Sequence, residues 1–436
     1  MNSRGNIAFL ICVLAAMGMA VATSTQGATW HVSSAAGGDG DGTADAPLNT
    51  VASAVEVAGA GDTIVVGKGR YVTTSAITID KAGLKVIGVT GEMPVIAASE
   101  EVNTIFNVIA SDVVLQDLVI RGGYYGVKID VNDKEPARRV VIRNCTIGAT
   151  AADCIKAFNA DGLRIEGCQI GPSGWKQPDN AEGIDVIGSI GVTIRGCVIQ
   201  DTATNGIYLK GGTRNGLIER CLVLRAGHGG ILLGQDTDEE AMRDHAVNEA
   251  IDCVARNNII IDTKSAGMGS YSGKNVSFLN NTLLNVARES QAGIWIVTNS
   301  REVPAEDVTV RNNIVSVGGD RPLLFMKDAA GMPNSDHNIF HIARGTERFV
   351  REIGADESLN KQWTLAQWQK ATGKDAHSRV GDPKVDARQF RPLAGSPAIG
   401  AGDSVGVEDD YFGHKRNGSA PDVGAVNASS IRGNAR

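Results

Sequence analysis

The stretch Val140-Val-Ile-Arg-Asn-Cys145 decides the fold, because close variants of it recur along the chain. Each variant alternates aliphatic and polar residues and ends in Cys or Asn, and an aliphatic residue usually follows two places later. The variants end, at intervals of 23 to 37 residues, at Cys145, Cys168, Cys197, Cys221, Asn258, Asn281 and Asn313. A degenerate repeat of this length indicates a solenoid.

A second repeated line begins with a small residue and then alternates, as in Gly126-Val-Lys-Ile and Gly206-Ile-Tyr-Leu. Alternation with a period of two predicts strands with one buried face. Two or three short strands per repeat, without helices between them, predict an all-β right-handed parallel β-helix, in which each strand pairs with its equivalent one coil away. A leucine-rich repeat would need a Leu-x-x-Leu-x-Leu frame, which the sequence lacks.

The parallel register stacks equivalent residues about 4.8 Å apart along the solenoid. Cys145, Cys168, Cys197 and Cys221 are therefore predicted to form one internal column of buried free thiols. Stacked Asn side chains at Asn258, Asn281 and Asn313 continue it. Adjacent rungs are close enough for a disulfide, but side chains stacked in register point the same way, which is poor disulfide geometry.

The repeat sets the expected organisation of the chain. Residues 29–340 are predicted to form the β-helix. A short amphipathic helix at Leu48–Ala58, just before a first strand at Asp62–Val66, is predicted to cap its N-terminal end. Residues 341–436 are predicted to be an irregular C-terminal extension that packs on or caps the other end and contains a short helix at Leu365–Ala371.

The N-terminus reads as a secretory signal peptide, with Arg4 followed by an apolar stretch at Ile7–Val21 that is short for a membrane span. Cleavage is predicted after residue 22 or, at a second small-residue site, after residue 28. The mature chain is then secreted, periplasmic or held at the cell surface. The net charge of −7 argues against a nucleic-acid partner, and we expect a monomer.

Aligning the coils brings one set of side chains to an outward face. Tyr208, Tyr271 and Trp295 flank this face, and aromatic rings suit sugar rings, so these three residues and Lys128 are predicted to bind substrate. An ordinary solvated strand face with salt bridges between rungs is the alternative. The outward set, with the turn residues that precede the strands, is Lys128, Asp130, Asp153, Lys156, Glu182, Asp185, Tyr208 and Lys210.

Asp153, Glu182 and Asp185 come from two neighbouring coils and are predicted to share one Ca²⁺, a cation that prefers carboxylate and carbonyl oxygens. Lys210, one coil further on, is the predicted general base. β-Elimination on a uronic acid needs such a base, a cation on the carboxylate and a positive charge for the enolate-like intermediate. Lys156 and Arg214 are candidates for that charge, and His228 is a further catalytic candidate.

These motifs resemble those of the pectate-lyase-like superfamily of β-helix proteins, and the site is most similar to that of family 9 pectate lyases. Asp153 followed by Asn180-Ala-Glu-Gly-Ile-Asp185 resembles their calcium site, although Ala181 stands where the family has an acid. Gly206-Ile-Tyr-Leu-Lys-Gly-Gly212 resembles the strand of their catalytic Lys, with Lys210 displaced by two places. The resemblance implies a secreted calcium-dependent lyase that cleaves a uronate-containing, anionic polysaccharide.

A partial resemblance to polygalacturonases comes from Asn180-Ala-Glu-Gly-Ile-Asp185 and Gly227-His-Gly229. Inverting glycoside hydrolysis requires two carboxyl groups, but Thr204-Asn205 stands at the Asp-Asp position and the Arg-Ile-Lys position is empty, which argues against a hydrolase. Three alternatives stay open beside the lyase: a non-catalytic carbohydrate-binding or surface-structural β-helix, a C5-epimerase and a glycoside hydrolase.

Overall fold

The computed structural model describes residues 27–132, 135–327, 332–353 and 361–430. The predicted signal peptide up to residue 22 lies outside the described residues. Within these ranges, no helix combines the length and apolar character needed to cross a membrane.

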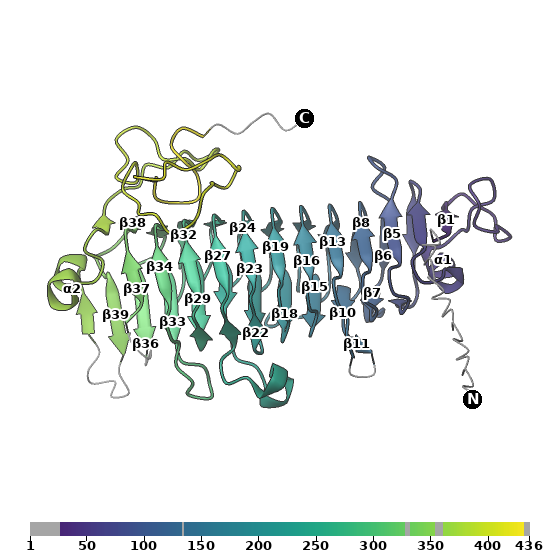
Figure 1. Cartoon of the computed structure of the whole chain (residues 1–436), viewed down its shortest axis with the longest axis horizontal. Coiled ribbons are helices and arrows are strands. Elements are labelled where there is room, and N and C mark those ends of the chain that lie inside the picture. The colour runs from purple at the N-terminus through teal and green to yellow at the C-terminus, as the bar shows by residue number, and fades with distance from the viewer. Residues whose placement is uncertain (1–26, 133–134, 328–331, 354–360, 431–436) are drawn as a thin grey trace, which may run out of the picture.

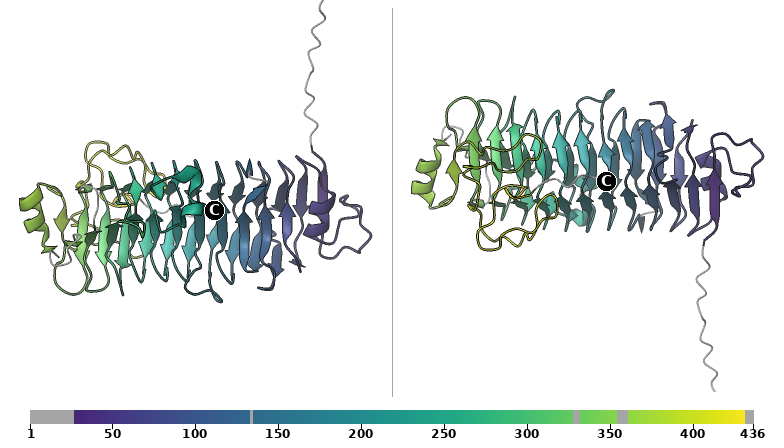
Figure 2. Two further views of the ribbon diagram at one scale, coloured as in Figure 1. Left: turned by 90° about the horizontal axis from the view of Figure 1, so that it is seen from below. Right: turned by 90° about the horizontal axis from the view of Figure 1, so that it is seen from above.

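Three long sheets run side by side along the molecule and form an elongated solenoid (Figure 1), and further views show the strands in rows along its long axis (Figure 2). We call them sheets A, B and C. Sheet A contains β1 (Thr29–Val32), β2 (Thr63–Val66), β5 (Lys85–Gly88), β8 (Val114–Gln116), β13 (Val141–Arg143), β16 (Arg164–Glu166), β19 (Thr193–Arg195), β23 (Leu217–Glu219), β27 (Val254–Arg256), β31 (Ser277–Leu279), β34 (Thr309–Arg311) and β37 (Asn334–Asp336).

Sheets B and C have the same stacked order. Sheet B contains β3 (Arg70–Val72), β6 (Val95–Ala98), β9 (Val119–Gly122), β14 (Thr146–Gly148), β17 (Gln169–Ile170), β20 (Val198–Gln200), β24 (Leu222–Leu224), β28 (Ile259–Ile261), β32 (Thr282–Val286), β35 (Ile314–Val317), β38 (Ile339–Ile342) and β41 (Arg379–Val380). Sheet C contains β4 (Ile77–Ile79), β7 (Thr104–Val108), β10 (Tyr125–Ile129), β15 (Ile155–Phe158), β18 (Ile184–Ile187), β21 (Ile207–Lys210), β25 (Ile231–Leu233), β29 (Met268–Tyr271), β33 (Ile294–Val297), β36 (Leu324–Lys327), β39 (Val350–Ile353) and β40 (Lys361–Trp363).

Smaller elements decorate these sheets. A three-stranded sheet contains β22 (Thr213–Arg214), β26 (Ala250–Ile251) and β30 (Gly273–Lys274), and a hairpin joins β11 (Val131–Asn132) to β12 (Glu135–Pro136). The loop between β25 and β26 contains two short 3₁₀ turns, η1 (Glu239–Ala241) and η2 (Arg243–His245).

The observed architecture confirms the predicted all-β right-handed parallel β-helix. In sheet C the register pairs Ile155 with Ile184 and Ile184 with Ile207, and all three are fully buried. The next position pairs Lys156 with Asp185 and Asp185 with Tyr208. The alignment of the coils from sequence is therefore confirmed, and it fixes which side chains are neighbours on the outer side of sheet C.

The column of stacked Cys and Asn residues is also confirmed. Cys145, Cys168, Cys197 and Cys221 are buried free thiols, and each thiol contacts backbone carbonyls, as Cys168 does with Ile142 O at 3.6 Å. The amides continue the column through a ladder. Oδ1 of Asn281 accepts from Asn258 N and Nδ2, while its own Nδ2 donates to Ala255 O and Asn313 Oδ1.

Helices cover both ends of the solenoid (Figure 1). The predicted N-terminal helix is confirmed as α1 (Val51–Val57), with Thr50 as its N-cap and Val51, Ala54 and Val55 buried. The expectation that Asp62–Val66 is the first strand is wrong, because β1 precedes α1 in the chain and pairs with β2. The second predicted helix is confirmed as α2 (Leu365–Thr372), whose Leu365 and Trp368 join the main core.

The solenoid strands continue past residue 340, since β39 pairs with β36 and β41 pairs with β38. The irregular residues 381–430 lie along the side of the solenoid (Figures 1 and 2). Arg416 anchors them by donating to Asn257 Oδ1 at 2.7 Å, and Asn312 Nδ2 donates to Asp403 O at 2.7 Å.

Replacing Asn281 with Ala should destabilise the protein by about 2–4 kcal/mol, because Asn258 N and Ala255 O then lose buried partners. Equilibrium urea unfolding measures the change. The matched control Asn334→Ala, at an exposed position of β37, should stay within about 0.5 kcal/mol of the parent. Equal effects of the two substitutions would contradict a stabilising role for the ladder.

Candidate functional site

Three carboxylates gather where two neighbouring coils enter sheet C. Asp153 lies in the turn before β15, Glu182 lies in the turn before β18, and Asp185 lies on β18. One oxygen of each lies within 4.8 Å of the others, which confirms that the coil alignment brings the three together. Their exposed fractions are 2%, 2% and 0%.

Lys156 supplies a positive charge to this cluster. Its Nζ lies 3.0 Å from Asp153 Oδ2 and 2.7 Å from Asp185 Oδ2. Asp153 Oδ1 accepts from the backbone N–H of Glu182 at 2.7 Å. The ammonium thus bridges two coils, and the backbone fixes the orientation of the Asp153 carboxylate.

Only one of the two carboxylate oxygens of Glu182 accepts hydrogen bonds from the described residues. Its Oε1 accepts from Thr204 Oγ1 at 2.5 Å and from Asn205 Nδ2 at 3.4 Å. Within the part of the chain that the structure describes, Glu182 Oε2 and Asp185 Oδ1 are buried and have no hydrogen-bond partner. Unpartnered buried oxygens of this kind are costly, and they are suited to bind a cation.

The electrostatics of the cluster follow from burial and like charge. Burial and the nearby Asp153 and Asp185 carboxylates raise the pKa of Glu182 to about 8. Burial also raises the pKa of Asp185, although the Lys210 and Lys156 ammonium groups oppose that shift. The pKa of Lys156 is raised by the Asp185 and Asp153 carboxylates, which outweigh its desolvation.

The sequence predicts that this outward face is exposed, and for its centre that prediction is wrong. Asp153, Glu182, Asp185 and Tyr208 are all at most 3% exposed. The reason is that the long side chains of this face turn toward the carboxylates, as Lys156 does, and remove them from solvent.

Lys210 lies beside Tyr208, next to the cluster. Its Nζ donates to Tyr208 Oη at 3.0 Å and lies 4.5 Å from the centre of the tyrosine ring. Burial and the Asp185 and Glu182 charges raise the pKa of Tyr208, so this phenol stays neutral. Lys210 is therefore in the neighbourhood that the sequence predicts for the base, and Tyr208 presents little surface to a substrate.

The other candidate groups lie further out. Arg214 lies on β22 in the small sheet and pairs with Asp244 at 3.6 Å. His228 is exposed in the turn before β25, and its backbone N donates to Thr204 O at 3.0 Å. Lys128 pairs with Asp130 at 2.6 Å and lies 5.6 Å from the ring centre of Phe158. Their predicted roles stay predictions.

The predicted aromatic flank forms a separate patch on later rungs of sheet C. Trp295 stacks on Phe325, with ring centroids 4.0 Å apart and an interplanar angle of 8°. Tyr271 packs against the same cluster and accepts from Gln291 Nε2 at 2.8 Å. The sequence analysis does not include Phe325 in the aromatic flank. The register would have identified it, because Phe325 pairs with Trp295 one rung further on.

A hollow of about 390 Å³ adjoins the site. Phe158 and Ile187 of sheet C form one wall, and the loop that carries Arg243 forms the other. Arg243 holds this loop in place by pairing with Asp161 at 2.9 Å. The sequence gives no signal for this pairing, because Asp161 and Arg243 are far apart in the chain.

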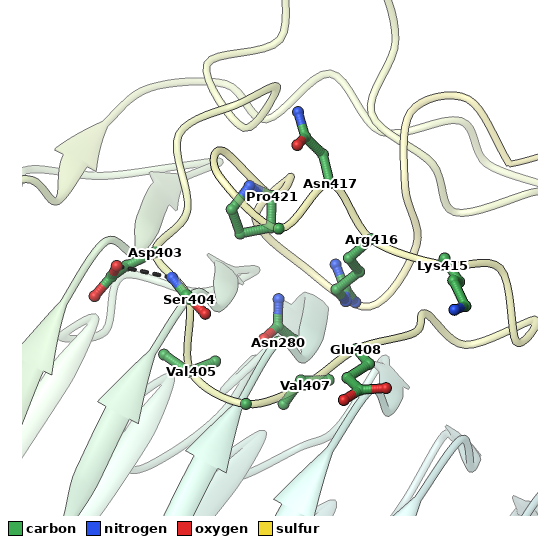
Figure 3. Close-up of a pocket in the computed structure, with 12 residues that line it drawn as sticks. Asn280, Asp403, Ser404, Val405, Val407, Glu408, Lys415, Arg416, Asn417 and Pro421 are labelled. Carbon is green, nitrogen blue, oxygen red and sulfur yellow. Dashed lines mark hydrogen bonds between the residues drawn. The ribbon is translucent and has the colours of Figure 1, made fainter.

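A second hollow of about 360 Å³ lies within the C-terminal segment (Figure 3). Asp403, Glu408, Lys415 and Arg416 are among its lining residues, and Asn280, between β31 and β32, forms part of its wall. It lies against the junction of sheets A and B, whereas the carboxylate cluster lies on sheet C, so we do not assign it to the same site.

Residues 125–315 match the family model described as a right handed beta helix region. The match supports the right-handed parallel β-helix fold seen in sheets A, B and C. No curated protein sequence matches the chain.

Solved structures extend this likeness over most of the chain. Pectate lyase Pel9A is similar with a TM-score of 0.62 and 15% identity, over 92% of this chain and 96% of that one. XylC, solved with xylose, is similar with a TM-score of 0.53 and 12% identity, over 91% of this chain and 98% of that one. At these identities the likeness shows the shared fold.

Replacing Glu182 with Gln should change how stability depends on pH. The raised pKa of Glu182 means that the unfolded chain loses this proton near pH 4.5 and the folded chain near pH 8, so stability falls as pH rises between them. The variant lacks that loss. Its free energy of unfolding relative to the parent should therefore rise between pH 5 and pH 8, by more than about 1 kcal/mol. Urea unfolding in chelator at several pH values checks this, and parallel profiles would contradict it.

Replacing Lys156 with Met should destabilise the metal-free protein by about 3–5 kcal/mol, because two buried carboxylates lose their countercharge. Lys128→Met is the matched control, since Lys128 occupies the paired position one rung earlier and its partner Asp130 is more exposed. That substitution should cost at most about 1 kcal/mol. Thermal and urea unfolding in chelator compare the two variants. Similar losses of stability would contradict the predicted role of Lys156.

Proposed function

We propose that the chain is a calcium-dependent polysaccharide lyase that cleaves a uronate-containing polymer by β-elimination. The observation that carries this proposal is the cluster of Asp153, Glu182 and Asp185, with two unpartnered buried oxygens and Lys210 close by. The fold that the chain shares with pectate lyase Pel9A supports the same class of reaction. The apolar segment at the N-terminus of the sequence supports export of the mature chain.

The donor set fits a hard cation. All three ligands are carboxylates, and Ca²⁺ prefers oxygen ligands. Glu182 Oε2 and Asp185 Oδ1 are unpartnered, so each can bind a cation without breaking a hydrogen bond. Asp153, Glu182 and Asp185 are therefore the residues that would hold Ca²⁺. One cation would offset the burial and the mutual repulsion that together raise the pKa of Glu182.

Bound Ca²⁺ would neutralise the uronate carboxylate and so acidify the proton on C5. Lys210 in its neutral form accepts that proton, a C4–C5 double bond forms, and the C4–O bond breaks so that the leaving oxygen takes up a proton. Tyr208 positions Lys210 through the contact between Oη and Nζ. Lys156 keeps a positive charge beside the cluster, where negative charge develops on the substrate.

One observation favours the second candidate, a non-catalytic carbohydrate-binding or surface-structural β-helix. Lys156 already pairs with both Asp153 and Asp185, so these three residues can also be explained as a buried ion-pair group that ties coils together. A C5-epimerase would use the same base and cation. Hydrolysis is less well supported, because Thr204 and Asn205 bind Glu182 and stand where a hydrolase needs acids.

Incubating the protein with pectate, alginate and glycosaminoglycans should release unsaturated uronate, detected by its ultraviolet absorbance. Chelator should abolish the signal and Ca²⁺ should restore it. Asp185→Asn should remove calcium dependence together with activity. Lys210→Ala should lower the rate by about 10²–10⁴-fold, the usual contribution of a general base, without unfolding the protein.

Lys264→Ala is the control, since Lys264 is an exposed residue in a turn paired with Glu289, and it should keep full activity. Full activity in chelator would remove the calcium role. New reducing ends without the absorbance would indicate hydrolysis, and altered C5 configuration without cleavage would indicate epimerisation. Binding of a polymer with no reaction would leave the non-catalytic alternative.

A further inference from the structure

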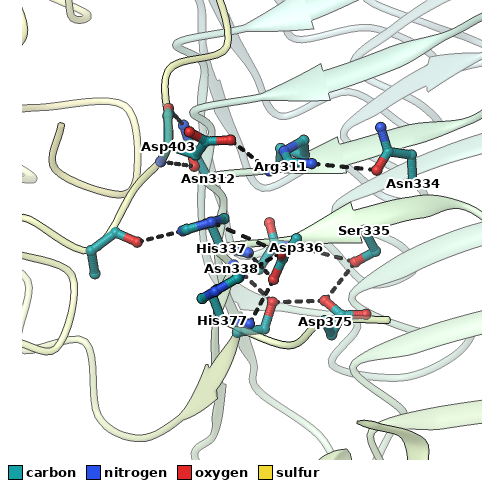
Figure 4. Close-up of polar contacts among 12 residues, drawn as sticks. Arg311, Asn312, Asn334, Ser335, Asp336, His337, Asn338, Asp375, His377 and Asp403 are labelled. Carbon is teal, nitrogen blue, oxygen red and sulfur yellow. Dashed lines mark hydrogen bonds and ion pairs between the residues drawn. The ribbon is translucent and has the colours of Figure 1, made fainter. Parts of the chain in front are cut away.

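Two histidines and an aspartate meet at the far end of sheet A, whereas the carboxylate cluster lies on sheet C. Asp336 ends β37, His337 follows it, and His377 lies in the turn after α2 (Figure 4). The two imidazole rings stack with centroids 4.6 Å apart and an angle of 14° between their planes. The fold therefore joins residues about 40 positions apart in a cluster that the proposed function does not use.

The ligand atoms lie close enough together for one small metal ion to bind all three. His377 Nδ1 lies 2.9 Å and His337 Nε2 lies 3.8 Å from the same oxygen, Asp336 Oδ2. One donor atom from each residue lies within 4.8 Å of the others. Zn²⁺ binds nitrogen and oxygen at about 2.0–2.2 Å in a tetrahedron, so neighbouring ligand atoms are roughly 3.3–3.5 Å apart. The distances of 2.9 Å and 3.8 Å fall on either side of that value. Because the two stacked ring planes are only 14° apart, one imidazole has to turn for both nitrogens to face one ion.

The outer contacts orient the donors. His337 Nδ1 lies 2.9 Å from Ala401 O, and since a carbonyl can only accept, Nδ1 donates this hydrogen bond and Nε2 is the nitrogen left to bind an ion. Ligating histidines typically donate their second N–H in this way. Asp336 Oδ1 accepts from the backbone N–H groups of His337 and His377, each at 2.8 Å, so Oδ2 is the oxygen turned toward the rings.

A simple ion pair between Asp336 and His377 would account for one imidazole but not for the second ring stacked on it. Nor would it need His337 to be fixed with its lone pair toward Asp336. The side chain of His377 is 66% exposed, while those of Asp336 and His337 are under 20% exposed. The cluster is thus partly buried and open on one side, where water can complete a coordination shell.

We propose that Asp336, His337 and His377 bind one Zn²⁺ or a similar borderline divalent ion through two imidazole nitrogens and one carboxylate oxygen. The mixed N/O donors distinguish this site from the all-oxygen cluster of sheet C, which suits a hard cation. The ion would join the last strand of sheet A to the turn after α2. Through His337 and Ala401 it would also fix the C-terminal segment.

Isothermal titration of ZnCl₂ into the full, tag-free, chelator-stripped chain tests the site. One ion should bind per chain and raise the melting temperature by mass action. His377→Ala and Asp336→Asn should each weaken binding at least tenfold. The Asn variant keeps an oxygen for the two backbone N–H groups but replaces the second oxygen with a non-ligating NH₂. Co²⁺ in place of Zn²⁺ should give visible absorption bands with parent chain only.

His414→Ala is the matched control, since His414 is a half-exposed histidine with Nδ1 3.8 Å from Asp410 Oδ1, and it should bind Zn²⁺ like the parent. Asp185→Asn should also bind normally, which separates this site from the sheet C cluster. Circular dichroism confirms folding of each variant. Absence of Zn²⁺ binding to the parent, undiminished binding to both His377→Ala and Asp336→Asn, or loss of binding in Asp185→Asn would overturn the proposal.

Discussion

Parallel pairing of each strand with its equivalent in the next coil is the constraint on which the rest of the structure depends. It places the residues at one position of the repeat in a row. A residue type that suits that position in one coil therefore recurs in the neighbouring coils. Inside, this produces the column of thiols and amides. On the outer face of sheet C, the same pairing places Lys156, Asp185 and Tyr208 on successive rungs. The carboxylate cluster consists of residues from that row and from the turns before its strands.

The rows also explain how the outer side of a β-sheet can hold a buried charged cluster. Its three carboxylates are distributed over two coils, and an ammonium group and a backbone N–H contact them across the rung spacing. Two oxygens stay without partners, which is the feature that an ion pair alone does not explain. Buried oxygens that lack hydrogen-bond partners are more informative about function than the shared fold, because similar β-helices support different chemistries.

Periodicity made the architecture and the rows predictable from sequence: the pairing of Asp185 with Tyr208, the burial of Cys168 and the approach of Asp153 to Asp185 all follow from one repeat. The direction of long side chains did not follow from it. Lys156 turns back onto Asp153, and Tyr208 is buried although its row faces outward. Contacts between distant segments were equally out of reach, since neither His377 beside Asp336 nor Arg243 beside Asp161 belongs to the repeat.

The amide ladder has a consequence for how such a chain can change length. Asn258 and Asn281 are 23 residues apart, and each accepts from the coil before it while donating to the coil after it. A duplication of that interval would insert a coil whose amide continues the same directional relay, so the molecule could lengthen by whole units without a mismatch. The interval from Cys221 to Asn258 spans a change of chemistry, and copying it would set a thiol beneath an amide that needs a hydrogen-bonding oxygen. Growth by gene duplication is therefore expected within the thiol part or within the amide part of the column, and not across the junction between them.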